Sequence, residues 1–143
     1  MKRALVTGGG SGAGAVIARA LADSGIAVTV CGRRAIEAPG MTSALCDVTD
    51  EAQVAALFAD HGPFDIVVAN AGASESAPFA KTEKAALDRM LAVNVTGTFL
   101  CTQAAVRRMS TRHGGAGGAI VNLSSIAATN GGGGQWTAYA AAK

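Results

Sequence analysis

Short apolar runs alternate with segments of helical spacing from the first residues of the chain. The runs ALVT (residues 4–7) and AVTVC (27–31) are short and close to glycine, so they predict buried strands rather than helices. Similar runs predict further strands at 43–48, 65–70 and 119–125. Between these strands, apolar residues recur at helical spacing. Helices are therefore predicted at 13–24, 50–60 and 82–112, and a last one at 137–143.

Strands that alternate with helices are typical of βαβ units and a parallel sheet. The pattern therefore predicts an α/β fold, a Rossmann-type doubly wound parallel sheet with helices on both faces. Ligands of such sheets bind beyond the carboxyl ends of the strands. In this sequence those ends are residues 8–14, 32–34, 47–48, 70–72 and 124–125.

Two glycine features interrupt the pattern. Gly97 lies inside the predicted helix 82–112, where glycine costs about 1 kcal/mol relative to alanine, so we expect a close contact of the helix there. The glycine run 131–134 is short and apolar residues follow it. We interpret this run as a loop over an active site, with Trp136 at the pocket entrance, rather than as a linker.

Composition narrows the class of protein. The chain has 143 residues, of which 50% are hydrophobic and 15% charged, which is typical of a globular domain. A net charge of +2 without a basic stripe argues against nucleic acid as a partner, and no apolar run is long enough to span a membrane. Cys31, Cys46 and Cys101 are odd in number and widely spaced, which favours free thiols in the cytoplasm. With only His61 and His113 besides, no metal site is predicted.

The segment TGGGSGAG (residues 7–14) follows a strand and opens a helix. Glycines in that position let the backbone approach a pyrophosphate, and the free N–H groups of the helix N-terminus bind its charge. A mononucleotide P-loop does not fit, because Gly14 is followed by Ala15 and Val16 instead of Lys and Ser or Thr. The segment therefore predicts a dinucleotide site. The alternative is a tight turn without chemistry.

The motif T-G-x-x-x-G-x-G of residues 7–14 resembles the coenzyme loop of the classical short-chain dehydrogenases/reductases. Further motifs of that family follow in order. They are DV at 47–48, NAG at 70–72, Asn94 in LAVNVTGTF, NLSS at 122–125 and YAAAK at 139–143. The resemblance covers the whole chain. It implies an oxidoreductase that interconverts a secondary alcohol and a ketone with a nicotinamide coenzyme, for example a 3-oxoacyl reductase or another carbonyl reductase.

The second strand ends in CGRR. NAD-binding sheets place an acidic residue there, which hydrogen-bonds the ribose 2′-hydroxyl. Here Arg33 and Arg34 stand instead, and a guanidinium binds a 2′-phosphate through paired hydrogen bonds. We therefore favour NADP(H) as the coenzyme. NAD(H), with both arginines exposed on a surface loop, is the alternative.

Tyr139 and Lys143 are four residues apart, so on a helix their side chains project from one face. Carbonyl reduction needs a proton donor, and an ammonium near a tyrosine stabilises the phenolate. By resemblance, Lys143 also binds the nicotinamide ribose, Ser125 hydrogen-bonds the substrate oxygen and Asn94 holds a water of the proton relay. We choose Ser125 because, by resemblance, the catalytic serine is the second of such a pair at the end of the strand. Ser125 precedes Tyr139 by 14 residues, one more than the family spacing, so Ser124 stays open as the alternative.

These motifs together define the predicted coenzyme contacts, which are Gly8, Gly10, Ser11, Gly12, Ala13, Gly14, Arg33, Arg34, Asp47, Val48, Asn70, Ala71, Gly72, Tyr139 and Lys143. An alternative function is a coenzyme-binding sensor or regulatory module without turnover. An intact set of serine, tyrosine, lysine and asparagine argues against that alternative, because a sensor has no need of it.

The family fold is about a hundred residues longer than this chain, so we expect residues 1–143 to be one coenzyme-binding domain of a longer enzyme, truncated after Lys143. In isolation it should be inactive and poorly stable, since the last helix ends one turn after Tyr139. Family members are dimers or tetramers joined through long helices, which implies a homo-oligomer. The substrate is a small carbonyl or alcohol that the sequence does not identify.

Overall fold

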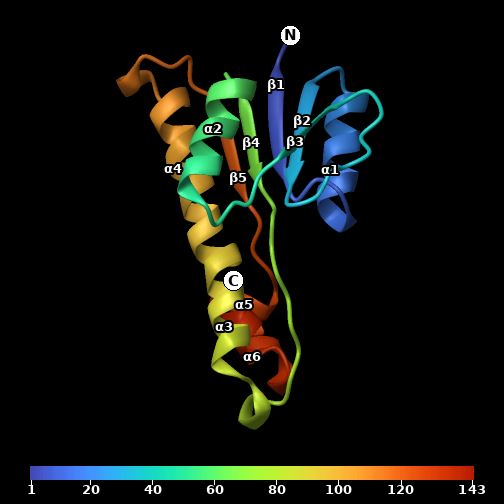
Figure 1. Cartoon of the computed structure of the whole chain (residues 1–143), viewed down its shortest axis with the longest axis vertical. Coiled ribbons are helices and arrows are strands. Elements are labelled where there is room, and N and C mark those ends of the chain that lie inside the picture. The colour runs from blue at the N-terminus through green and yellow to red at the C-terminus, as the bar shows by residue number, and fades with distance from the viewer.

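The computed structural model describes residues 1–143 as five strands and six α-helices, with short 3-10 and π-helical turns between them (Figure 1). The strands are β1 (Arg3–Thr7), β2 (Ala27–Gly32), β3 (Thr42–Leu45), β4 (Ile66–Ala69) and β5 (Ala119–Asn122). The helices are α1 (Gly12–Asp23), α2 (Glu51–His61), α3 (Lys84–Leu91), α4 (Thr98–Met109), α5 (Ala127–Asn130) and α6 (Thr137–Ala142).

All five strands form one parallel sheet in the order β3-β2-β1-β4-β5. From β1 the chain extends the sheet to one side through β2 and β3, and then to the other side through β4 and β5. This is the doubly wound arrangement that the sequence predicts. The strand order reverses between β1 and β4, so the crevice outside their carboxyl ends is the expected ligand site.

Helices cover both faces of the sheet (Figure 1). Helices α2 and α4 contribute Phe58, Cys101 and Met109 to a cluster of 14 buried residues on one face. On the other face α1 packs through Ala18 in a cluster of only six. The face of α1 is the thinner side of the core because the connection from β2 to β3, residues 33–41, contains no helix.

Helices α3 and α4 form one continuous column below and beside the sheet, joined by a π-helical turn at Ala92–Gly97 (Figure 1). The column confirms the long helix predicted at 82–112, within two or three residues at each end. A β-carbon at Gly97 would lie 2.6 Å from Cγ2 of Val48, so the expected close contact of the helix is with the segment after β3. The short helix α6 packs against α3.

Three strands are shorter than predicted, and β4 lacks one residue at each end of the predicted range. Strand β3 ends at Leu45 because Asp47 turns the chain, its carboxylate accepting hydrogen bonds from the N–H and hydroxyl of Thr49. Strand β5 ends at Asn122, although the N–H of Leu123 still donates to the sheet. Ser125 therefore lies beyond the strand, where its hydroxyl accepts a hydrogen bond from the N–H of Ala127 at the start of α5. The glycine run forms a 3-10 turn that leads into α6.

Candidate functional site

The glycine loop between β1 and α1 has a backbone that favours glycine. Gly8 has a φ of +65°, and its N–H donates to the carbonyl of Cys31 at the end of β2. Gly14 is buried in the first turn of α1, where a β-carbon would overlap the carbonyl oxygen of Gly8. No acidic side chain lies in the first turn of α1, and Ser11 does not cap it. The N–H groups of this helix end are therefore free to bind an anion.

Asn70 links the end of β4 to the glycine loop. Its carboxamide nitrogen donates to the carbonyls of Thr7 and Gly8, at 2.9 and 3.2 Å. In return the hydroxyl of Thr7, which is 1% exposed, accepts from the N–H groups of Asn70 and Ala71, both at 3.0 Å. Thr7 is a structural partner that our sequence analysis did not single out, although it is the first residue of the loop motif.

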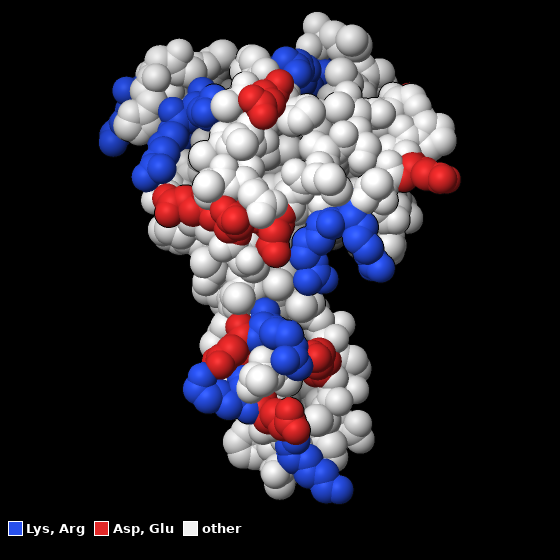
Figure 2. All heavy atoms as spheres, in the orientation of Figure 1, with Lys and Arg blue, Asp and Glu red and all other residues white.

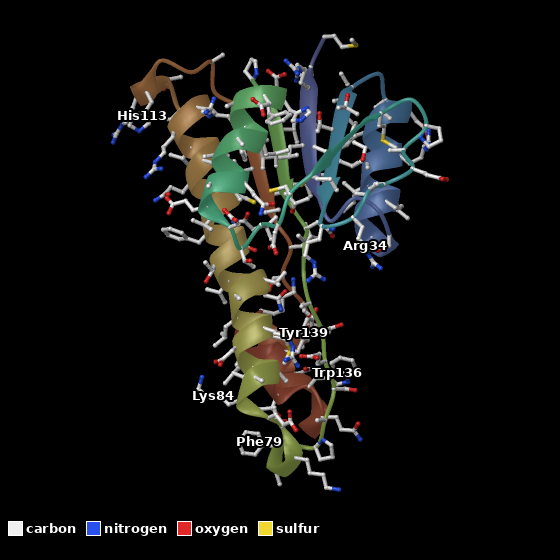
Figure 3. All side chains as sticks on the ribbon, in the orientation of Figure 1. Arg34, Phe79, Lys84, His113, Trp136 and Tyr139 are labelled. Atoms are coloured by element: carbon white, nitrogen blue, oxygen red, sulfur yellow. The ribbon has the colours of Figure 1, made fainter.

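A cavity of about 550 Å³ opens at the carboxyl ends of β1, β2 and β3. Its walls contain Gly8, Gly10, Ser11, Arg33, Arg34, Asp47, Val48, Ala71 and Gly72, and also Cys31, Cys46 and Ile36. Arg33 and Arg34 are exposed and form no hydrogen bond or ion pair within the chain. Figure 2 shows basic side chains at the lower edge of the sheet, where Figure 3 labels Arg34.

A second cavity of about 480 Å³ continues from the first, with which it shares Gly8, Ser11 and residues 71–73. Its walls contain Gly12, Ala13, Gly14, Asn70, Ser74, Ser124, Tyr139 and Lys143. All the predicted coenzyme contacts thus line one or both cavities. Asn94 and Ser125 line neither.

Tyr139 of α6 and Lys143, the residue after this short helix, both line the second cavity. Figure 3 shows Tyr139 beside Trp136. The ammonium of Lys143 lies 6.0 Å from the ring centroid of Tyr139 and donates a hydrogen bond to the carbonyl of Leu123 at 2.9 Å. The rings of Trp136 and Tyr139 meet edge to face, with centroids 5.9 Å apart. The pair is therefore held between an aromatic ring and the end of β5.

The two serines differ in their surroundings. Ser124 lines the second cavity, and its hydroxyl donates to the carbonyl of Lys143 at 3.1 Å. Ser125 is half-buried, and its hydroxyl accepts from the N–H of Ala127 at 3.2 Å. The geometry brings Ser124, and not Ser125, to the cavity with Tyr139. Ser125 stays our prediction, because it is the second serine of the pair that resembles the family motif, and Ser124 stays its alternative.

Asn94 lies in the π-helical turn and is 6% exposed. Its carboxamide forms two hydrogen bonds with Ala73, accepting from the N–H and donating to the carbonyl, both at 2.8 Å. A β-carbon at Gly72 would lie 3.1 Å from its Oδ1 and 3.6 Å from Nζ of Lys143. Asn94 thus holds the segment after β4, and it lines a further cavity together with Lys143.

The three cysteines are buried free thiols, and Cys31 and Cys46 line the first cavity. A hydrogen bond to Cys46 and burial raise the pKa of Cys31, and burial raises the pKa of Cys101 to about 12. Both thiols are therefore protonated near neutral pH. The chain contains no group of three His, Cys, Asp or Glu residues placed to hold a metal ion, and none of its helices is long and apolar enough to cross a membrane.

Comparison with known proteins gives consistent matches. A family model described as short chain dehydrogenase matches residues 2–143. An uncharacterised oxidoreductase of Escherichia coli is 39% identical over an alignment that covers 100% of this chain and 65% of the relative. A cis-4-hydroxycyclohexanecarboxylate dehydrogenase of Sinomonas cyclohexanicum is 42% identical, and the alignment covers 86% of this chain and 54% of that protein.

Among solved structures, a gluconate 5-dehydrogenase from Burkholderia cenocepacia in complex with NADP and tartrate is similar with a TM-score of 0.88 and 33% identity. That similarity covers 99% of this chain and 60% of the other. The chain thus spans between about half and two thirds of the length of the relatives that it matches.

Proposed function

Because the chain belongs to the short-chain dehydrogenase family, we propose that it binds NADP(H) and serves an oxidoreductase that interconverts a secondary alcohol and a ketone. The observation that carries this proposal is the pair of connected cavities at the switch point of the sheet. The glycine loop and two arginines line one of them, and Tyr139 and Lys143 line the other.

The glycine loop fits a dinucleotide in shape as well as in sequence. Side chains at Gly8 or Gly14 would collide with neighbouring backbone, so the loop leaves its N–H groups uncovered beside the cavity. The pyrophosphate would lie at the free N-terminus of α1. By resemblance to the family, Asp47 and Val48 would hold the adenine, and both line the same cavity as the loop.

The guanidinium groups of Arg33 and Arg34 have no partner in the chain, which leaves their donors for a 2′-phosphate. The NADP in the gluconate 5-dehydrogenase structure supports the same coenzyme for this chain. NAD(H) remains the alternative coenzyme, and the Kd values of the two coenzymes decide between them.

When bound, the nicotinamide supplies or accepts the hydride. The hydroxyl of Tyr139 would give its proton to the carbonyl oxygen of the substrate, and the ammonium of Lys143 would stabilise the phenolate that remains. Ser125, or Ser124 in its place, would donate a hydrogen bond to the same oxygen as charge develops on it. Asn94 would act beside them by holding a water near Lys143 and by fixing the backbone at Ala73.

The substrate proposal is a small molecule with a secondary alcohol or ketone, and both a 3-oxoacyl reductase and another carbonyl reductase fit it. The protein would be a cytoplasmic homo-oligomer. An apolar stripe on the helical column supports oligomerisation, because Val95, Phe99 and Val106 are between 43% and 61% exposed along one line. Light scattering after gel filtration measures the oligomeric state.

The proposed function is tested with Tyr139→Phe in the full-length enzyme. NADPH oxidation with a panel of ketones should disappear in this variant, whereas the Kd for NADPH should stay within about twofold, because the phenol oxygen is needed only in the chemical step. Turnover that persists in Tyr139→Phe would overturn the role of Tyr139. Full-length wild-type protein that binds NADPH but oxidises it with no ketone would support the second candidate, a coenzyme-binding sensor.

A further inference from the structure

The connection from β2 to β3 is nine residues long (33–41) and begins with the two arginines of the first cavity. It crosses the face of the sheet beside α1 as an extended loop (Figure 1). A helix at this point would hold its first residues through its own backbone hydrogen bonds. Here the chain lacks that support, so other contacts must hold the backbone of Arg33 and Arg34.

Ile36 provides those contacts on the inner side of the loop. A β-carbon at Gly10 would lie 2.9 Å from Cγ1 of Ile36 and 3.2 Å from its Cδ1. A β-carbon at Gly32 would lie 3.3 Å from the same Cδ1. The isoleucine side chain therefore packs directly on two glycines, one in the coenzyme loop and one at the end of β2.

The outer side of the loop is tied more weakly. The N–H of Ile36 donates to the hydroxyl of Ser43 at 3.3 Å, and the guanidinium of Arg19 reaches the carbonyl of Pro39 at 3.4 Å. Both bonds are exposed to water and long, so each contributes little. The apolar contact of Ile36 is the one that joins this loop to the glycine loop.

We propose that Ile36 is a positioning residue for coenzyme selection, which holds the backbone of Arg33 and Arg34 against the glycine loop so that their guanidinium groups face the 2′-phosphate. This inference rests on the proposed binding of NADP(H). Ile36 lines the same cavity as both arginines, two residues after Arg34, and its packing fixes the distance between the phosphate-binding loop and the arginines. Preorganised donors bind an anion more tightly because less side-chain and backbone freedom is lost on binding.

The test measures the Kd values of NADP⁺ and NAD⁺ by calorimetry for the wild type and for Ile36→Ala. The two ligands differ only in the 2′-phosphate, so the ratio of their Kd values isolates that group. We expect Ile36→Ala to weaken NADP⁺ binding about tenfold and NAD⁺ binding by no more than about twofold, since each arginine loses its preorganisation. Ile36→Val keeps Cγ1, the carbon that lies nearest to Gly10, but loses Cδ1, so it should restore part of the NADP⁺ affinity.

Ile26→Ala is the matched control. Ile26 is a half-buried isoleucine packed on the same cluster, next to the opposite end of β2 and away from both cavities. Ile26→Ala should leave the ratio of the NADP⁺ and NAD⁺ Kd values unchanged, although it removes a similar amount of apolar contact. An equal loss of both ligands in Ile36→Ala, or the same ratio change in Ile26→Ala, would overturn the positioning role. A wild type that binds NAD⁺ more tightly than NADP⁺, or neither of them, would instead overturn the proposed coenzyme and this inference with it.

Discussion

The side chain of Asn94 pairs with the backbone of Ala73 through two hydrogen bonds of 2.8 Å, one to the N–H and one to the carbonyl. The pair is 21 residues apart in sequence and part-buried. It joins the π-helical turn of the long helical column to the segment after β4, which lines both cavities. The carboxamide of Asn94 thus satisfies the two backbone groups of Ala73 that a neighbouring strand would otherwise bond.

Asn94→Ala should lower the free energy of unfolding by about 2 kcal/mol, because the N–H and carbonyl of Ala73 lose their partners in a part-buried position. Urea unfolding followed by circular dichroism measures the change. Asn122→Ala is the control, because Asn122 is exposed and accepts one hydrogen bond from Thr102. It should cost less than about 0.5 kcal/mol. Equal losses in the two variants would contradict the proposed support of the segment after β4.

Arg3 holds the end of α2. Its guanidinium donates to the carbonyls of His61 and Gly62, at 2.6 and 3.1 Å, and these carbonyls have no partner within the helix. Arg3→Ala should therefore cost about 1–2 kcal/mol of unfolding free energy. The exposed neighbour Lys2 provides the control, and Lys2→Ala should change stability by less than about 0.5 kcal/mol. Thermal or urea unfolding of both variants checks this, and a neutral Arg3→Ala would refute it.

Two glycines of the coenzyme loop should respond differently to alanine. At Gly14 the new β-carbon would overlap the carbonyl of Gly8, so we expect a loss of about 3 kcal/mol or more. At Gly12 nothing lies within 4 Å, and only the φ of +52° disfavours alanine. That variant should cost about 1 kcal/mol. Urea unfolding of the two variants separates steric collision from backbone strain, and similar losses would show that the loop relaxes around Gly14.

The buried thiol of Cys101 should make stability depend on alkaline pH. Burial raises its pKa in the folded protein to about 12, from 9.0 for a free thiol. Between these values the unfolded chain has lost the proton and the folded chain has kept it, so unfolding becomes more favourable as the pH rises. The slope from this one group reaches about 1.4 kcal/mol per pH unit. Below pH 8 the group should contribute no slope.

Cys101→Ala tests whether the thiol of Cys101 causes the loss of stability at alkaline pH. The variant should be less stable than the wild type near neutral pH, because the substitution leaves a small cavity, but its stability should fall less steeply above pH 9. Urea midpoints measured from pH 7 to pH 10.5 give the two slopes. Parallel curves for the wild type and the variant would assign the alkaline loss to other groups.

Much of the architecture could be predicted from local patterns. Buried strands such as Arg3–Thr7 and Ala27–Gly32 stand out as apolar runs next to glycine, and α1 follows from its position after the glycine loop. The ends of the strands were harder to predict from local patterns. Asp47 ends the third strand through a turn that its own side chain makes, and Ser125 starts a helix where an extension of the fifth strand was predicted. At each of these residues the chain could either continue the strand or leave it, and packing determines which of the two occurs.

The spacing of Tyr139 and Lys143 and the order of the motifs are properties of the sequence, since a helix places residues four apart on one face wherever it packs. The residues that contact Asn94, Ile36 and Gly97 cannot be predicted from the sequence in the same way. Ala73, Gly10 and Val48 reach these residues from other elements, over separations for which the chain has no local pattern. Which serine faces the tyrosine likewise depends on where β5 ends and α6 packs. Periodicity determines which side chains share a face of each element. The contacts between elements form only when the sheet and its helices are assembled.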